Sequence, residues 1–212
     1  MILSVCPNPS VDCTIELDML KTGALNRVEN KVITYSGKAL NAAIGVARLG
    51  GDSFATGFMF DDNGKMFVHT LDDEGVKNTF VWNKGGARTN YKIVDKRSMM
   101  TEINDKGESV GEKEQDELAD LVGELSATAS VVIMSGSLPS GVADDYYLRL
   151  SERIPKNVKK IFDVTGDRLV NALKGGAYLV KPNLDELREI TGEHYDGFDE
   201  MLGGCRRLLG AG

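Results

Sequence analysis

The sequence predicts an α/β fold in which a mostly parallel sheet is flanked by helices. The first observation is a regular alternation of helical and strand patterns from about residue 111 to residue 209, which is typical of βαβ units. The second is a change of pattern at 11–35 and 78–104, where short alternating segments predict a small, mostly exposed antiparallel sheet. The third is that polar motifs follow the apolar strands, at the end where open α/β sheets bind ligands.

The first half of the chain alternates apolar strands with two helices. The strand-like segments are either largely apolar or alternate apolar with polar residues, and they cover 1–6, 11–17, 27–35 and 53–60. Two segments with apolar residues at helical spacing end at glycines, which favour the left-handed conformation that closes a helix. These predicted helices cover 38–49 and 64–74.

Residues 78–104 contain three short alternating segments separated by polar, hairpin-like breaks. Together with 11–17 and 27–35 they predict the exposed antiparallel sheet. The second half of the chain has strands predicted at 130–134, 159–163 and 177–180. Its helices are predicted at 112–126, 143–153, 168–174, 184–191 and 198–209, the last of them closed by Gly210-Ala211-Gly212.

Composition limits the classes of function. The 212 residues suit one α/β domain, and 42% hydrophobic with 27% charged residues is typical of a soluble globular protein. A net charge of −7 argues against nucleic acid or an anionic membrane as the main partner. It is compatible with a small anion held by a few converging basic side chains.

Cysteine usage predicts a reducing compartment. Cys6, Cys13 and Cys205 are an odd number at spacings unlike those of metal sites, so we expect free thiols and no zinc site. The N-terminal run lacks the basic residues of a signal peptide, and no segment is apolar for the roughly 20 residues of a membrane span. The expectation is a cytoplasmic protein without a membrane partner.

A polar turn opens the helix predicted at 38–49. Gly37 permits a tight turn in which backbone N–H groups meet an anion at the helix N-terminus. Lys38 adds a positive charge there, and Asn41 lies one turn further along the same helix. The alternative is an ordinary loop-to-helix turn with a solvated lysine.

Three more polar motifs follow apolar strands. Asp12 comes after two prolines that stiffen the loop behind the first strand, and Ser137 lies behind the strand at 130–134. The motif Asp163-Val164-Thr165-Gly166 ends the strand at 159–163. Carboxylates suit sugar hydroxyls, and hydroxyl and amide donors suit phosphate. The alternative for Asp12 and Ser137 is a local turn in which their side chains bond nearby backbone groups.

The motif Lys181-Pro182-Asn183-Leu184-Asp185-Glu186 stands at a helix start. Asn183 and Glu186 are three residues apart, so both can face one point, and two oxygen ligands with water suit Mg²⁺. The alternative is an N-cap with its capping carboxylate, which needs the same spacing. Arg27 and Arg88 stand in the exposed-strand regions, where solvated surface arginines are the alternative.

In this order and at these spacings the motifs resemble the ribokinase-like (phosphofructokinase B) family of carbohydrate kinases, especially its branch of 1-phosphofructokinases and tagatose-6-phosphate kinases. The resemblance spans the whole chain and is carried by Asn8-Pro9-Ser10-Val11-Asp12, Asn26-Arg27-Val28, Gly37-Lys38-Ala39-Leu40-Asn41, Arg88-Thr89-Asn90, Thr101-Glu102-Ile103-Asn104, Ser135-Gly136-Ser137-Leu138-Pro139 and Lys181-Pro182-Asn183-Leu184-Asp185-Glu186. It implies a three-layer ribokinase-like fold with a small antiparallel β lid, formed by about 11–17, 27–35 and 78–104. The lid is expected to cover the sugar and to serve as the face of a homodimer.

The resemblance also implies roles for individual residues. Those expected to hold sugar hydroxyls are Asp12, Asn41 and the Gly37 backbone. Those expected to hold the phosphate already on the sugar are Lys38, Arg27, Arg88, Ser137 and Asn90. Lys181 and Asn183 would reach the phosphates of ATP, and Asn183 with Glu186 would organise Mg²⁺ and its waters.

The implied activity is ATP-dependent phosphorylation of a ketohexose monophosphate to a bisphosphate, with fructose 1-phosphate preferred and tagatose 6-phosphate second. The family's Gly-Ala-Gly-Asp signature, which supplies the general base and an anion hole, is expected beyond Gly212. Residues 1–212 are therefore expected to form a partial kinase domain that lacks the C-terminal part of the fold and is inactive alone.

Two other classes of function are weighed against the kinase. One is a sugar-phosphate-binding fragment or regulatory module without catalysis. The other is a dinucleotide oxidoreductase, which needs a Gly-x-Gly-x-x-Gly turn after the first strand. Residues 6–12 are rich in Pro and Asp instead, so the oxidoreductase is disfavoured.

Overall fold

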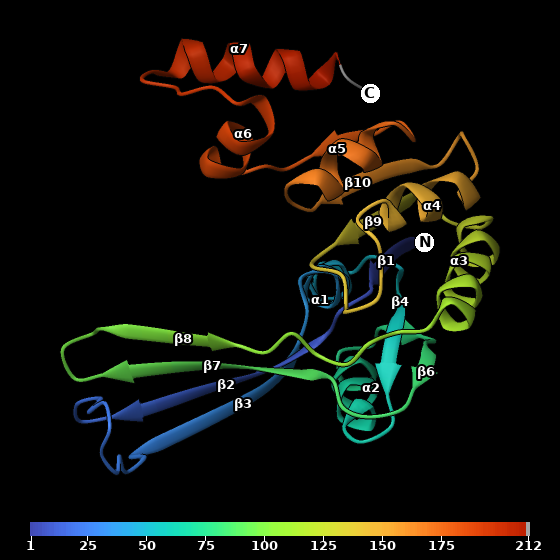
Figure 1. Cartoon of the computed structure of the whole chain (residues 1–212). Coiled ribbons are helices and arrows are strands. Elements are labelled where there is room, and N and C mark those ends of the chain that lie inside the picture. The colour runs from blue at the N-terminus through green and yellow to red at the C-terminus, as the bar shows by residue number, and fades with distance from the viewer. Residues whose placement is uncertain (211–212) are drawn as a thin grey trace.

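The main sheet is wholly parallel and forms the centre of the molecule, shown by a computed structural model that describes residues 1–210 (Figure 1). Its strands run in the order β11-β10-β9-β1-β4-β5, and β6 also pairs with β4. Their bounds are β1 Ile2–Cys6, β4 Ser53–Phe60, β5 Lys77–Asn78, β6 Val81–Asn83, β9 Val131–Ser135, β10 Lys159–Asp163 and β11 Leu179–Val180. The predicted parallel α/β sheet is confirmed. Ala211 and Gly212 of the predicted helix C-cap lie outside the described residues.

The chain changes direction in the sheet beside β1. It first adds β4 and β5 on one side of β1, and then returns to place β9, β10 and β11 on the other side. At such a switch point the loops behind neighbouring strands separate, which opens a crevice beyond their carboxyl ends. The loops that follow β1, β9 and β10 therefore share one edge of the sheet.

The central strands are apolar because helices cover them. Leu3, Val5 and Phe58 have no exposed surface, and Leu118 of α3 is also fully buried in the same core. Burying each such side chain stabilises the fold by about 2 kcal/mol. Helix α1 packs on β1, β4 and β9, whereas α3 packs on β1, β4 and β6.

The helices match the predicted ones in number and order within the described residues. Their bounds are α1 Lys38–Arg48, α2 Gly64–Asp73, α3 Glu112–Ser126, α4 Tyr146–Arg153, α5 Asp167–Leu173, α6 Leu184–Thr191 and α7 Phe198–Leu209. Most of their ends coincide with the predicted ones, and the others differ by one to three residues. Across residues 1–210, no helix has both the length and the apolar composition needed to cross a bilayer.

A separate four-stranded sheet, which we call the lid, projects away from the main sheet (Figure 1). Its order is β3-β2-β7-β8, with bounds β2 Ser10–Leu17, β3 Asn30–Ser36, β7 Arg88–Asp95 and β8 Met100–Asn104. The lid was predicted to be antiparallel, and this is corrected in one place: β2 and β7 pair in parallel. The reason is connectivity, because β7 enters the lid from β6 in the main sheet and so runs in the same direction as β2.

The lid segment predicted at 78–104 begins later than predicted, at Arg88. Residues 78–87 were expected to belong to it, but β5 and β6 pair with β4 in the main sheet. Phe80 and Val81 are each 8% exposed and contribute to the main core. A short alternating segment fits any half-buried strand, so its pattern could not distinguish the lid from the edge of the main sheet.

Candidate functional site

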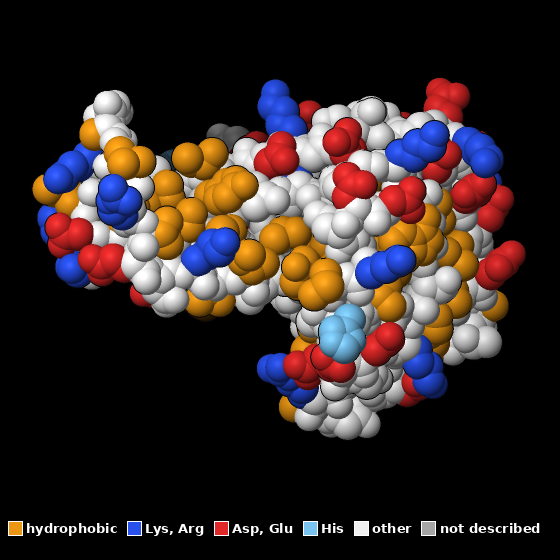
Figure 2. Space-filling model, turned by 90° about the horizontal axis from the view of Figure 1, so that it is seen from below, with side chains coloured by type: hydrophobic (Ala, Val, Ile, Leu, Met, Phe, Trp, Pro, Cys, Tyr) orange, Lys and Arg blue, Asp and Glu red, His pale blue; other side chains and the backbone are white. Residues whose placement is uncertain are grey.

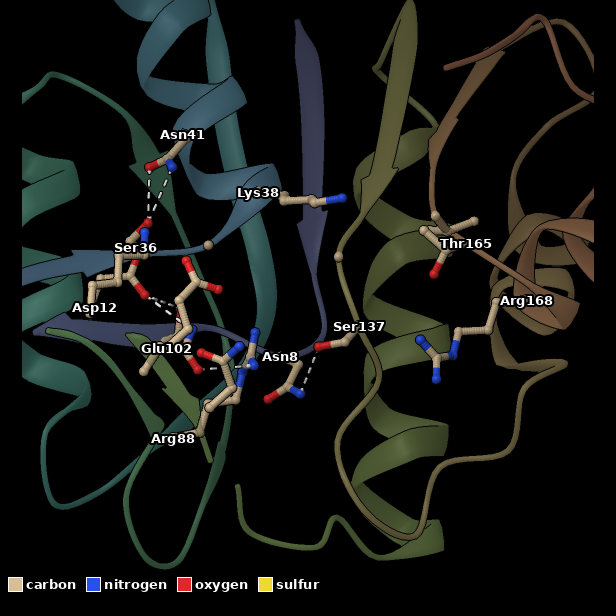
Figure 3. Close-up of a pocket in the computed structure, with 17 residues that line it drawn as sticks. Asn8, Asp12, Ser36, Lys38, Asn41, Arg88, Glu102, Ser137, Thr165 and Arg168 are labelled. Carbon is tan, nitrogen blue, oxygen red and sulfur yellow. Dashed lines mark hydrogen bonds between the residues drawn. The ribbon is translucent and has the colours of Figure 1, made fainter. Parts of the chain in front are cut away.

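A cavity of about 440 Å³ lies between the carboxyl ends of the main strands and one face of the lid (Figure 3). Loops behind β1, β9 and β10, the start of α1 and all four lid strands contribute to it. The lining residues are Asn8, Ser10, Asp12, Ser36, Gly37, Lys38, Asn41, Arg88, Asn90, Lys92, Glu102, Asn104, Gly136, Ser137, Val164, Thr165 and Arg168. The predicted convergence of Asp12, Gly37, Lys38, Asn41, Arg88, Asn90 and Ser137 on one site is thus observed.

Asp12 is held by donors on one of its two carboxylate oxygens. Ser10 Oγ donates to Asp12 Oδ1 at 3.2 Å, and Asn90 Nδ2 donates to the same oxygen at 3.1 Å. Arg88 Nη1 donates in turn to Asn90 Oδ1 at 3.3 Å. No side-chain donor within residues 1–210 bonds the second oxygen of Asp12, which leaves it available to accept from a ligand hydroxyl.

The first turn of α1 reaches the cavity because residue 37 has no side chain. A Cβ at Gly37 would lie 2.6 Å from Cys6 Sγ, closer than packed atoms approach. The glycine therefore lets the helix start sit directly on β1, with Lys38 at its first position. Asn41 Nδ2 donates to Ser36 Oγ at 3.1 Å, so the amide is oriented at the rim of the cavity (Figure 3).

Ser137 is positioned by Asn8, which is 6% exposed. Asn8 Nδ2 donates to Ser137 Oγ at 3.0 Å and to Leu138 O at 3.2 Å. A hydroxyl that accepts one bond can direct its own proton elsewhere, here toward the cavity. The preceding residue, Gly136, has φ +109°, a conformation that favours glycine, and its carbonyl accepts from the Tyr147 hydroxyl at 3.1 Å.

Asp163, at the end of β10, lies between two lysines. Its Oδ1 is 3.1 Å from Lys181 Nζ and 3.9 Å from Lys38 Nζ, while its Oδ2 accepts from Ser135 Oγ at 3.0 Å. Lys38 lines the cavity and Lys181 does not. Lys181 therefore lies beside the cavity rather than in it, linked to the lining residue Lys38 through the carboxylate of Asp163.

Asn183 and Glu186 make a capping box at the start of α6. Asn183 Oδ1 accepts from Glu186 N at 2.9 Å, and Glu186 Oε2 accepts from Asn183 N at 2.8 Å. The capping alternative is therefore observed, and neither residue lines the cavity. Within residues 1–210, no group of three or more His, Cys, Asp or Glu side chains is arranged to hold a metal.

Arg27 is the predicted substrate residue that this chain does not bring to the cavity. The segment between β2 and β3 lies at the free end of the lid (Figure 1). Arg27 belongs to this segment and lines a separate small hollow. Its segment was predicted as a strand from residue 27, but β3 begins at Asn30. Arg27 is therefore apart from the cavity on which the other predicted substrate residues converge.

Several lining residues were not assigned a role from the sequence. Lys92, Glu102 and Asn104 lie on lid strands, and Thr165 and Arg168 lie behind β10. For the lid residues a signal was present, because Lys92 is two positions from Asn90 and so shares its face of the strand. For Thr165 the signal was its motif at a strand end, whereas Arg168 on α5 carried none.

A second cavity of about 320 Å³ adjoins the first. The two share Asn8, Arg88, Ser137 and Arg168, and the second adds Lys106 and Asp144. Arg168 Nε donates to Asp144 Oδ1 at 2.9 Å, so this guanidinium is already engaged by a carboxylate. Arg88 Nε is buried and has no hydrogen-bond partner among the described residues.

The thiol beneath the cavity is inert. Burial raises the pKa of Cys6 to about 11, so the side chain is a neutral thiol at physiological pH. A buried thiol of raised pKa is a poor nucleophile. Cys6 therefore serves packing beneath Gly37, and the chemistry of the cavity belongs to its oxygen and nitrogen groups.

Comparisons with known proteins found relatives of similar sequence and architecture. A sequence model described as pfkB family carbohydrate kinase matches residues 8–202. The chain is 32% identical to 1-phosphofructokinase of Borreliella burgdorferi over 212 residues, which is all of this chain and 68% of that protein. The tetrameric inhibited form of phosphofructokinase-2 from Escherichia coli is 26% identical with a TM-score of 0.90, over 100% of this chain and 70% of that one. The same enzyme in complex with fructose-6-phosphate is 25% identical with a TM-score of 0.89, over the same shares.

Proposed function

The chain belongs to the pfkB family of carbohydrate kinases, and from that premise we propose that it binds a ketohexose monophosphate for ATP-dependent phosphorylation to a bisphosphate. Fructose 1-phosphate is the preferred substrate, supported by the relative named 1-phosphofructokinase. Tagatose 6-phosphate is the second candidate. The comparisons do not favour a regulatory module over a kinase.

The observation that carries the proposal is the arrangement of polar and charged side chains in the cavity. Asp12 and Asn41 offer oxygen and amide groups for sugar hydroxyls, while Lys38, Arg88 and the Ser137 hydroxyl offer donors for a phosphate. Neutral amides stand between the carboxylate and the cations, as in the chain Asp12–Asn90–Arg88. Such a site suits a ligand with hydroxyls at one part and an anion at another.

The nucleotide is proposed to lie beyond Asp163, toward Lys181. This lysine is joined through Asp163 to Lys38, so phosphates near Lys181 would lie close to the sugar side of the site. Asn183 and Glu186 each use one side-chain oxygen for the cap of α6, and two residues alone make an incomplete metal site. Asn183 and Glu186 would therefore need further ligands to hold Mg²⁺.

Phosphoryl transfer depends mainly on positioning and on stabilising charge, with a base to accept the hydroxyl proton. The cavity contains two carboxylates, Asp12 and Glu102. Asp12 is proposed to hold sugar hydroxyls, and Glu102 lies on an exposed lid strand. The general base is accordingly proposed to lie outside residues 1–212, so that these residues bind the sugar phosphate weakly and turn it over negligibly.

Binding is tested by titrating residues 1–212 with fructose 1-phosphate and, separately, with tagatose 6-phosphate. Asp12→Asn keeps the shape but removes the acceptor charge, and is expected to weaken binding about tenfold, since hydrogen bonds to charged groups contribute roughly 1.5–3 kcal/mol. Asp61→Asn is the matched control, because Asp61 is exposed and outside the cavity. Equal affinities for parent and Asp12→Asn would contradict the assignment of the cavity.

Turnover is tested separately by ATP-dependent formation of bisphosphate. Residues 1–212 are compared with the Borreliella burgdorferi 1-phosphofructokinase at equal folded concentration. General-base catalysis contributes about 10²–10⁴-fold, so residues 1–212 should be slower by at least that factor. Comparable rates would show that the base lies within residues 1–212.

The lid is proposed to form a homodimer through the face turned away from the cavity. Ile33, Cys13, Tyr91 and Ile103 form one cross-strand row on that face. Tyr91 is 41% and Ile103 56% exposed. Figure 2 shows hydrophobic side chains gathered along the projecting lid. A second lid packed on this row would cover these apolar side chains. The dimer would then contain two Arg27 side chains, one from each lid.

A further inference from the structure

The lid presents its cavity face in two polar cross-strand rows. The row nearer the main sheet contains Asp12, Asn90 and Asn104, which stand opposite one another in register. The next row outward contains Thr14, Lys92 and Glu102. In the first row Asn90 donates to Asp12, whereas the charged side chains of the second row make no hydrogen bond or ion pair with described residues.

Four cationic side chains line the cavity, and they differ in whether a carboxylate of the chain lies close to them. Lys38 lies 3.9 Å from Asp163, and Arg168 lies 2.9 Å from Asp144. Arg88 and Lys92 are within ion-pair distance of no carboxylate in the described part of the chain. Both belong to β7, on the same face and four residues apart, with Asn90 between them. Positive charge that no protein carboxylate neutralises is what an anionic ligand requires.

Glu102 is the direct cross-strand neighbour of Lys92. Residues opposite each other on paired strands have Cβ atoms about 5 Å apart, and opposite charges there attract. The attraction holds the Lys92 ammonium on the cavity face of the lid without the close contact of an ion pair. A phosphate dianion carries more charge than one carboxylate, so it would compete with Glu102 for this ammonium.

We propose that Lys92 contacts the phosphate of the bound sugar directly and is the residue that selects a phosphorylated over an unphosphorylated ketohexose, with Glu102 opposing it. The inference rests on the proposed function and adds a cation to Lys38, Arg88 and Ser137. It also gives Glu102 a defined effect, because a carboxylate beside the site repels the phosphate. The two residues should therefore act with opposite signs on the affinity for the sugar phosphate.

The experiment is a ligand-observed NMR titration of residues 1–212 with fructose 1-phosphate and with fructose as the phosphate-free probe. Lys92→Met is expected to weaken fructose 1-phosphate about tenfold and to leave fructose unchanged. Lys92→Arg keeps the charge and should stay within about threefold of the parent. Glu102→Gln should bind fructose 1-phosphate a few-fold more tightly, because it removes a repelling charge.

Lys31→Met is the matched control. Lys31 lies on β3 of the same lid, opposite Ile15 and therefore on the face turned away from the cavity. It removes the same charge from the same sheet, so it should leave the affinity for fructose 1-phosphate unchanged. If Lys31→Met and Lys92→Met weaken binding equally, the effect is one of net charge and the inference is overturned.

Other outcomes are equally decisive. Lys92→Met binding fructose 1-phosphate as tightly as the parent, or losing fructose and fructose 1-phosphate together, would overturn the assignment of Lys92. Weaker fructose 1-phosphate binding by Glu102→Gln would overturn the opposing role of Glu102. If the parent itself binds neither fructose 1-phosphate nor tagatose 6-phosphate, the proposed function has failed before any variant is measured.

Discussion

Asn8 joins two loops that lie 129 positions apart in the chain. It is buried, and its single amide nitrogen donates to both Ser137 and Leu138. Because Asn8 acts on the cavity through Ser137, it is a positioning residue. The direction of the hydrogen bond between Asn8 and Ser137 is what matters. The amide nitrogen can only donate, so the Ser137 hydroxyl accepts from Asn8 and keeps its own proton free to donate to a ligand.

Asn8→Asp tests this direction. The carboxylate has the same shape but can only accept, so the Ser137 proton should turn away from the cavity and fructose 1-phosphate binding should weaken about fivefold. Calorimetric titration measures the loss. In a Ser137→Ala background the same substitution should have little further effect, whereas a merely structural role would add its full loss in both backgrounds.

Cys6 makes the stability of the protein sensitive to alkali. Burial raises its pKa from 9.0 to about 11, so between these values the folded state keeps a proton that the unfolded state loses. This stabilisation is fully present below pH 9 and is lost as the pH rises through 11. At pH 10 the free energy of unfolding should be about 1.4 kcal/mol lower from this group. Urea unfolding at pH 7 and pH 10 measures it, and Cys6→Ala should lose less stability over the same interval.

At the scale of the element, the β7–β8 hairpin is closed by one carboxylate. Asp95 Oδ1 accepts from Arg97 N at 2.9 Å and from Met99 N at 3.2 Å, and Asp95 Oδ2 accepts from Arg97 Nε at 3.0 Å. The side-chain bond from Arg97 is the main reason that the pKa of Asp95 is lowered, with the backbone bonds adding to it and partial burial opposing it. Ser98, with φ +60°, completes the turn.

Asp95→Ala should loosen this hairpin while leaving the main sheet intact. The expected result is faster hydrogen exchange at the amides of residues 96–99 and of β8, because the N–H groups of Arg97 and Met99 lose the oxygen that accepts from both. The parent should show the same change in acid: a lowered pKa stabilises above the ordinary value near 3.9 and the contribution disappears as the pH falls through the folded value. Asp18→Ala is the control, because Asp18 also lies at the end of the lid and its side chain contributes only an ion pair with Lys96. Equal exchange in both variants would contradict the role of Asp95.

Local periodicity accounts for how well the elements were predicted. Helices such as α3 and α7 repeat apolar residues at helical spacing, and β1 and β4 are largely apolar, so each carries its own signal. The partner of a strand is not local. The parallel pairing of β2 with β7 and the position of β6 depend on segments far away in the sequence, and both were predicted wrongly.

The same contrast holds for the candidate site. Five site residues lie in motifs whose composition indicates a strand end or a helix start, and the structure brings them together. They are Asp12, Gly37, Lys38, Asn41 and Ser137. Lys92 and Glu102 lie inside ordinary alternating strands, where only register decides which face meets the cavity. Arg27 belonged to a motif, but its distance from the cavity depends on the length and direction of the lid.

At the scale of the whole molecule, the proposed lid dimer can be tested directly. Ile103→Glu places a charge in the exposed apolar row and should convert a dimer to a monomer in sedimentation velocity, since an unpaired charge in an apolar interface is strongly unfavourable. Glu102→Gln, on the neighbouring position but the cavity face, should leave the mass unchanged. A monomeric parent would refute the dimer, as would a dimer that tolerates Ile103→Glu.

The parallel pairing of β2 with β7 sets an order of events during synthesis on the ribosome. The β2–β3 hairpin is complete at Ser36, but its partner strand begins only at Arg88. At about 5–20 residues per second, the completed β2–β3 hairpin waits roughly 3–10 seconds before β7 begins to emerge. During that interval the edge of β2, which carries the apolar residues Val11, Cys13 and Ile15, is open to pairing with any other nascent strand. Correct assembly of the lid thus depends on the speed of translation between residues 36 and 88.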